Sequence, residues 1–220
     1  MSTQRLCARM SAYFTEYQKS CKDISMTQDG SSNQGQPLVN SPKLAWDFDN
    51  FASDFAENHE LCYLTPDNKK ISRCLSSVDA IILDSINDKI ILVEFKYDKV
   101  GHPERNKKDG GFHFVYNKSE RDYELWIYRK FTESLIMLMS DCGLEFEECA
   151  RKVQGLLVLN AGDNHLTHNT NKTNHLRQFS IRTRGSYRRE LHTLKQLEGA
   201  LFSSVQVLSE KAFDDLFPSE

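Results

Sequence analysis

Three charged side chains interrupt the most apolar part of the chain, the stretch 76–99. Asp79 precedes the apolar run AIIL, and Glu94 and Lys96 stand two residues apart at the end of the run IILVEFK. Side chains alternate between the two faces of a strand, so Glu94 and Lys96 share one face with Ile90 and Leu92. Two acids and a base on one face are residue types that can hold a divalent cation and order a water molecule for hydrolysis.

The pairing of the two runs decides whether Asp79 reaches the same place. The short polar sequence between them predicts a hairpin. A turn centred on Ile86 and Asn87 sets Asp79 opposite Glu94, whereas a turn centred one residue later sets it opposite Lys96. A loop of odd length would put Asp79 on the other face.

Two neighbouring carboxylates raise each other's pKa unless a cation lies between them, and Lys96 alone cannot neutralise both. Mg²⁺ or Mn²⁺ would suit the site, because such hard cations take one or two carboxylates together with water molecules. The backbone carbonyl of Phe95 is a further candidate ligand. The alternative is a structural ion pair at a strand end.

The order of Asp79, a hairpin and the sequence EFK (94–96) resembles the core of the PD-(D/E)xK nuclease superfamily, which has the restriction-endonuclease-like fold. The resemblance covers about 47–160. It implies an α-β-β-β-α-β core, with the aspartate on the second strand and the E-x-K residues on the third. Val78 stands where the family's motif has proline.

The same resemblance implies roles for individual residues. Asp79 and Glu94 would hold the metal, and Lys96 would position or deprotonate the attacking water. Many members add an acid from the first helix; here Asp54 and Glu57 are the candidates, and Glu57 is preferred.

The elements that must position these residues indicate an α/β fold, a central mixed β-sheet flanked by α-helices. Residues 1–42 are expected to form an N-terminal helix (4–22) and a polar linker, and 43–220 the nuclease-like domain. Within that domain the periodicity predicts helices at 47–59, 119–141, 187–202 and 210–217, and strands at 61–64, 75–84, 89–97, 154–160 and 204–209. The ranges 98–118 and 161–176 are expected to be loops.

A basic segment contrasts with the formal net charge of −3. Seven Lys or Arg residues and one acid lie in 172–195, a pattern suited to nucleic-acid phosphates. Arg182, Arg184, Arg188 and Arg189 are the candidate contacts; a solvated helix face is the alternative. Arg129 and Lys130 of the helix 119–141 are likewise either site residues or part of a solvated face.

Other polar residues have plainer explanations. His165, His168 and His175 are spaced too irregularly to indicate zinc, and we interpret them as part of a polar surface loop. The six cysteines form no C-x-x-C pair and are expected to be reduced thiols. No apolar run approaches the length of a membrane span, and the first residues lack the apolar region of a signal peptide, so we expect a cytoplasmic protein.

These observations favour a Mg²⁺-dependent nuclease that hydrolyses phosphodiester bonds. The resemblance implies DNA as the substrate, and the sequence itself leaves the choice between DNA and RNA open. The first alternative is a catalytically inactive protein of the same fold that binds nucleic acid or a protein partner. The second is an unrelated α/β interaction protein in which the charged residues form an ion pair. Residues 1–42 are a candidate surface for a partner or a second copy of the chain.

Overall fold

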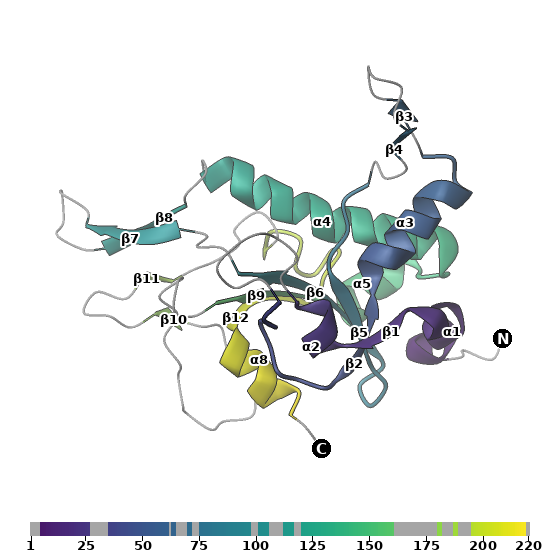
Figure 1. Ribbon diagram of the computed structural model, residues 1–220, viewed down its shortest axis with the longest axis horizontal. Helices are drawn as coiled ribbons and strands as arrows, with labels where there is room; N and C mark the ends of the chain where they lie inside the picture. Colours follow the sequence, from purple (N-terminus) through teal and green to yellow (C-terminus); the bar gives the residue numbers. More distant parts are fainter. Residues whose placement is uncertain are drawn as a thin grey trace.

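The two apolar runs form neighbouring strands in the middle of a mixed sheet. The computed structural model describes residues 5–26, 35–61, 63–64, 70–71, 75–97, 101–105, 112–116, 120–160, 180–181, 187–188 and 195–218. In it β5 (Ala80–Asp84) pairs antiparallel with β6 (Lys89–Lys96). The main sheet has six strands in the order β1-β2-β5-β6-β9-β12. The predicted α/β fold with a central mixed sheet is confirmed (Figure 1).

The remaining strands complete this sheet and form three small hairpins. The other sheet strands are β1 (Gln18–Ser20), β2 (Leu44–Asp47), β9 (Val153–Leu159) and β12 (Ser204–Ser209). β1, β2, β5 and β6 are paired antiparallel in turn, and β6, β9 and β12 run parallel. The hairpins pair β3 (Tyr63–Leu64) with β4 (Lys70–Ile71), β7 (Gly101–Arg105) with β8 (Phe112–Tyr116), and β10 (Ser180–Ile181) with β11 (Tyr187–Arg188). Figure 1 shows β3–β4 and β7–β8 projecting from the body of the molecule.

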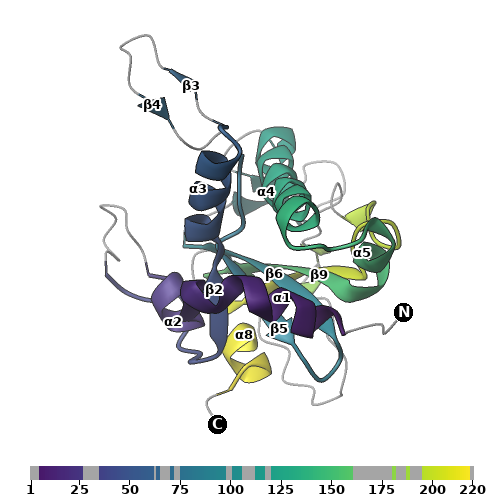
Figure 2. The ribbon, with the colours of Figure 1, turned by 90° about the vertical axis from the view of Figure 1, so that its right-hand side faces the viewer.

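Helices cover both faces of the sheet. They are α1 (Leu6–Phe14), followed by the 3₁₀ turn η1 (Thr15–Tyr17), and α2 (Cys21–Ile24), α3 (Phe48–Asn58), α4 (Glu120–Asp141), α5 (Phe146–Lys152) and α8 (Glu210–Leu216). Helices α3 and α4 lie on one side of the sheet and α8 on the other (Figure 2).

The predicted helices α3 and α4 are confirmed close to their expected bounds. Phe48, Phe51 and Phe55 recur at helical spacing and are buried, and the side chain of Asp47 caps the helix by accepting a hydrogen bond from the Asn50 amide at 3.3 Å. Helix α4 is followed by Gly143, whose φ of 66° is the left-handed conformation that ends many helices.

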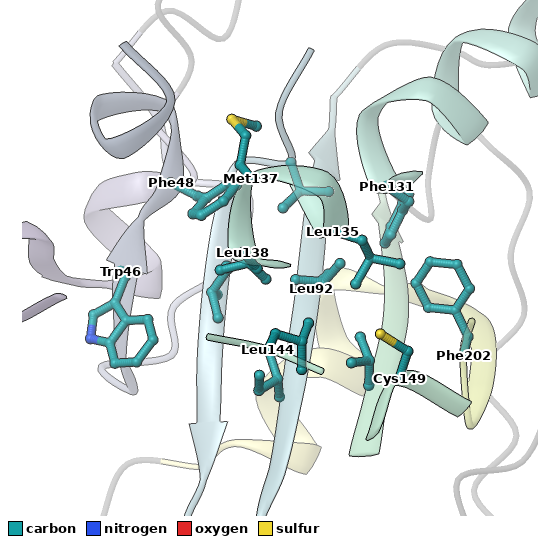
Figure 3. Packing of buried hydrophobic residues seen from close by; sticks show 14 of the residues in the cluster. Trp46, Phe48, Leu92, Phe131, Leu135, Met137, Leu138, Leu144, Cys149 and Phe202 are labelled. Carbon is teal, nitrogen blue, oxygen red and sulfur yellow. The ribbon is translucent and has the colours of Figure 1, made fainter. Parts of the chain in front are cut away.

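Two apolar clusters sandwich the sheet because its central strands are buried on both faces. The cluster under α1, α3, α4 and α5 contains Ile90 and Leu92 of β6 together with Phe131 of α4 (Figure 3). The cluster under α2 and α8 contains Ile91 and Val93. Glu94 follows the alternation and falls on the same face as Ile90 and Leu92, as predicted.

The N-terminal segment departs from its predicted form. The helix expected over 4–22 is wrong beyond Phe14, since β1 follows and pairs with β2. Leu6 and Met10 of α1 are fully buried in the larger core cluster. Part of the predicted N-terminal helix and linker therefore belongs to the domain. It adds an edge strand to the main sheet and side chains to the core.

Other elements were misassigned for local reasons. The strand expected at 61–64 is only Tyr63–Leu64, and it pairs with β4. The strand beside β5 is β2, which was not predicted because it has only four residues and directly precedes α3. The expected loop 98–118 contains β7 and β8, despite its glycine and charge content. The helix predicted over 187–202 is wrong at β11, and α5 was not predicted.

The described cysteines are reduced thiols, as predicted. Cys7, Cys21, Cys142 and Cys149 are buried and free, and burial raises the pKa of the Cys21 thiol to about 12. Cys62 and Cys74 lie outside the described residues. Within the described part of the chain, no helix combines the length and apolarity that a membrane crossing requires.

We expect Gly155→Val to lower the free energy of unfolding by about 1–3 kcal/mol, because α4 packs directly on the glycine. A Cβ added to Gly155 would lie 3.1 Å from Cε1 of Phe131 and 3.6 Å from Cγ2 of Val205. Urea unfolding measures the change. Gly155→Ala should have a smaller effect, and Phe131→Leu should restore part of the lost stability in the valine variant. Unchanged stability of Gly155→Val would contradict this packing.

Candidate functional site

The hairpin register brings Asp79 opposite Glu94. Ala80 pairs with Val93, and Asp84 pairs with Lys89 across a four-residue turn. The turn is therefore centred on Ile86 and Asn87, the first of the two registers considered. Both carboxylates lie on the face of the sheet that α3 and α4 cover.

Asp79 lies just where the ladder between β5 and β6 ends. Its Oδ2 accepts a hydrogen bond from the Phe95 amide at 2.6 Å, while the Val78 amide turns away and donates to Ser134 Oγ of α4 at 3.0 Å. The carboxylate thus replaces a backbone acceptor beyond the last paired residue. The amide and carbonyl of an extended residue point to the same neighbouring strand, so the Phe95 carbonyl also points toward the Asp79 side.

The whole segment before β5 is held by α3 and α4. The Ser76 amide donates to the Glu133 carboxylate, and Ser77 Oγ donates to Asp49 Oδ1 at 2.5 Å. The Asp79 carbonyl accepts from the Phe48 amide at 3.1 Å, which satisfies one of the free donors at the start of α3. These bonds fix the backbone that carries Asp79.

Glu94 has no exposed side-chain surface and is paired with two lysines. Lys130 Nζ of α4 lies 2.7 and 2.8 Å from Glu94 Oε1 and Oε2, and Lys96 Nζ lies 2.7 Å from Oε1. Lys130 Nζ also lies 3.4 Å from Asp79 Oδ1. Two ammonium groups therefore balance the two carboxylates.

Burial and the nearby charge of Asp79 raise the pKa of Glu94 to about 7, although Lys96 and Lys130 oppose the shift. Burial alone would lower the pKa of Lys130, but the negative charges of Asp79, Glu94 and Asp49 raise it, so Lys130 is charged. The cluster combines a carboxyl group that titrates near neutrality with an ammonium group that stays protonated.

Trp126 of α4 lies against both lysines. Lys96 Nζ is 4.4 Å and Lys130 Nζ 5.0 Å from the centre of its ring, within the range of cation–π attraction. Each ammonium is 2.7 Å from Glu94 Oε1, so the two nitrogens are separated by at most twice that distance. Two ammonium groups on opposite faces of the ring would lie farther apart. Both ammonium groups thus lie over one face of Trp126, a residue that is 38% exposed.

The structure brings together Asp79, Glu94, Lys96 and the backbone of Phe95, as the sequence predicted. It also brings Lys130 to the carboxylates, so Lys130 is not part of a solvated helix face. Trp126 was not predicted, although its position four residues before Lys130 places it on the same side of α4.

The preferred acid from the first helix is not at the cluster. Glu57 is exposed and lies nine residues, roughly 13 Å, along α3 from Phe48 at the Asp79 end. Asp54 is also exposed and accepts a hydrogen bond from Tyr17 Oη at 2.5 Å. The acid of α3 whose charge acts on Lys130 is Asp49, and its carboxylate accepts a hydrogen bond from Ser77. Its place in the first turn of α3 was the available signal.

The basic candidates cannot be placed in the same way. Arg182, Arg184 and Arg189 lie outside the described residues, and only the backbone of Arg188, in β11, is described. His165, His168 and His175 also lie outside them.

The donor set of the cluster is compatible with Mg²⁺ or Mn²⁺. Among the residues that the structure describes, no group of three or more His, Cys, Asp and Glu side chains is arranged to hold a metal ion. Mg²⁺ needs fewer, since it usually keeps several water molecules and takes one or two carboxylates. Asp79, Glu94 and the Phe95 carbonyl meet that requirement.

Comparisons with known proteins do not place the chain. No protein-family model matches it, and neither does any curated protein or solved structure.

We expect Ser134→Ala to lower the free energy of unfolding by about 1–3 kcal/mol, because it leaves the buried Val78 amide without its acceptor. Ser53→Ala is the matched control: Ser53, like Ser134, donates to the carbonyl four residues earlier in its helix. Thermal or urea unfolding compares the two. Equal losses of stability would contradict the role assigned to Ser134.

Glu94→Gln should flatten the dependence of stability on pH. Because the folded state raises the pKa of Glu94 from 4.5 to about 7, its stabilising contribution is complete below the lower value and is lost as pH rises through the higher one. In metal-free buffer, the wild-type free energy of unfolding should therefore fall more steeply between roughly pH 5 and pH 8.5 than that of Glu94→Gln.

Glu148→Gln is the control for this measurement. Although burial opposes it, the Glu145 amide and the Arg9 guanidinium lower the pKa of Glu148, so its stabilising contribution is present at neutral pH and is lost only in acid. Glu148→Gln should therefore lower stability by a constant amount above about pH 5 and leave the slope there unchanged. Parallel curves for the wild type and Glu94→Gln would show that Glu94 does not titrate as described.

Proposed function

We propose that the chain is a Mg²⁺-dependent nuclease that hydrolyses phosphodiester bonds in DNA, with a restriction-endonuclease-like core. The observation that carries the proposal is the convergence of Asp79, Glu94 and Lys96 at the end of one hairpin, with Glu94 fully buried. Burial of an acidic pair is costly, so its position in a sheet centre favours a functional reason for it.

The order of the central strands supports the proposed core. β2, β5, β6 and β9 are adjacent, and α4 lies between β6 and β9 in the chain. Glu94 and Lys96 lie in the third of these strands, as the PD-(D/E)xK resemblance implies. Asp79 directly precedes the second strand, one residue before the place that the resemblance implies. The departure is α3, which follows the first strand instead of preceding it.

Each residue has a chemical role in the proposed reaction. Asp79, Glu94 and the Phe95 carbonyl would hold Mg²⁺, which when bound supplies a water molecule of lowered pKa and stabilises charge on a phosphoryl oxygen. Lys96 would orient the attacking water, since its ammonium is anchored beside Glu94. Hydrolysis joins the water oxygen to phosphorus, breaks the bond to the ester oxygen, and leaves the departing oxygen with a proton.

The remaining parts of the proposal rest on the sequence. DNA as the substrate comes from the family resemblance. The basic segment 172–195 would contact backbone phosphates, which makes binding weaker at higher salt concentration.

One observation favours a second candidate, a catalytically inactive nuclease fold that binds nucleic acid or a protein partner. Lys130 already contacts both Asp79 and Glu94, and Lys96 contacts Glu94, so both carboxylates have a cationic partner without a metal. A protein of this kind would bind DNA in a salt-dependent way and show no Mg²⁺-dependent cleavage.

Plasmid cleavage with MgCl₂ tests the first candidate. We expect cleavage that EDTA abolishes, and a loss of at least about 100-fold in Glu94→Gln and Lys96→Ala, because each removes a group at the reacting phosphate. Lys152→Ala is the control, since Lys152 is ion-paired with Asp88 and Glu148, residues outside the cluster. Wild-type activity in Glu94→Gln and Lys96→Ala would show that the site is assigned wrongly.

A further inference from the structure

The ammonium of Lys130 takes up the space between the two carboxylates. It lies within hydrogen-bonding distance of both Glu94 oxygens, at 2.7 and 2.8 Å, and 3.4 Å from Asp79 Oδ1. The Lys130 side chain is only 12% exposed, so this position is inside the protein. Without a metal, Lys130 is thus the cation that compensates the two neighbouring carboxylates.

A divalent cation and this ammonium compete for the same oxygens. A Glu94 oxygen that accepts a hydrogen bond from Lys130 directs a lone pair at the ammonium. A divalent cation bound to the same oxygens would also be repelled by the ammonium, and a partly buried site screens that repulsion poorly. Metal binding at Asp79 and Glu94 therefore requires the Lys130 ammonium to move.

The surroundings of Lys130 indicate where its ammonium can go. Its flexible stem of four carbons allows the charged end to move while the backbone of α4 stays in place. Trp126 lies on the same side, with Lys130 Nζ 5.0 Å from the ring centre, and its ring and Lys96 are both partly exposed. Movement toward Trp126 keeps a cation–π contact and brings the ammonium to the solvent side.

We propose that Lys130 is an exchangeable internal cation, which holds Asp79 and Glu94 together in the metal-free protein and swings toward Trp126 and the solvent when Mg²⁺ binds. There it becomes a binding residue for a phosphate oxygen of the substrate. The inference rests on the proposed function, because it concerns the same metal site. It adds an order of events: the site attracts a phosphate only after the divalent cation has entered and released Lys130.

A purely structural ion pair predicts the opposite behaviour. Lys152 is the matched case in this chain, with Asp88 Oδ2 at 2.8 Å and Glu148 Oε1 at 3.4 Å from its ammonium. Like Lys130, it contacts two carboxylates, and those carboxylates have no proposed metal role. A lysine of this kind keeps its partners when Mg²⁺ is added.

Reductive methylation of the full-length wild-type protein, read out for each lysine by mass spectrometry, distinguishes the two. We expect MgCl₂ to raise the rate of Lys130 modification at least several-fold and to leave Lys152 unchanged. An unchanged rate at Lys130, or an equal change at both lysines, would overturn the inference. In Asp79→Asn/Glu94→Gln, Lys130 should react rapidly with or without MgCl₂.

Titration calorimetry with MgCl₂ at alkaline pH provides a second readout that needs no catalysis. Lys130→Met should bind Mg²⁺ at least about tenfold more tightly than the wild type, because the competing charge is gone, and Lys152→Met should bind it equally well. If neither the wild type nor Lys130→Met gives a heat of binding and DNA is not cleaved, the proposed function fails together with this inference. If Mg²⁺ binds and DNA is cleaved, but Lys130→Met has wild-type Mg²⁺ affinity and MgCl₂ does not change the rate of Lys130 modification, only the inference fails.

Discussion

Glu94 carries its carboxylate into the centre of the protein, and its charge must be compensated there, because a buried unpaired charge is far more costly than the fold could tolerate. Lys96 comes from the same strand, but Lys130 comes from α4, so the compensation depends on where that helix sits. The packing of Phe131 on Gly155 and the bond from the Val78 amide to Ser134 hold α4 at that height over the sheet. Charge compensation at Glu94 therefore depends on the core packing that positions α4.

The presence of Asp79, Glu94, Lys96 and Lys130 in one cluster needs a reason other than stability. Buried ion pairs often contribute little net stability, and apolar residues of similar volume commonly replace them without loss. An apolar residue would suit the position of Glu94 in β6, since Ile90 and Leu92 occupy the preceding positions on the same face. The proposed nuclease chemistry supplies a reason for keeping Glu94, as a metal ligand whose second cation, Lys130, is exchangeable.

The sequence predicted those features that depend on neighbours along the chain. Strand alternation and a turn of even length were enough to place Asp79 on the same face as Glu94 and Lys96. The sequence left open which of the two it faces, and the register of the hairpin selects Glu94. The contribution of Lys130 and the choice of Asp49 over Glu57 depend on how two helices pack on the sheet, which periodicity does not specify. β1 and β2 are too short to give a clear pattern, and the arginines proposed to contact DNA lie outside the described residues.

A crystal structure of the protein soaked in MnCl₂, with anomalous scattering data, tests the central claim most directly. Our account predicts an anomalous peak bound by carboxylate oxygens of both Asp79 and Glu94, with the Lys130 ammonium moved from between them toward Trp126. Crystals that bind no Mn²⁺ at this position, with Lys130 still bonded to both carboxylates, would contradict it and favour a structural ion pair.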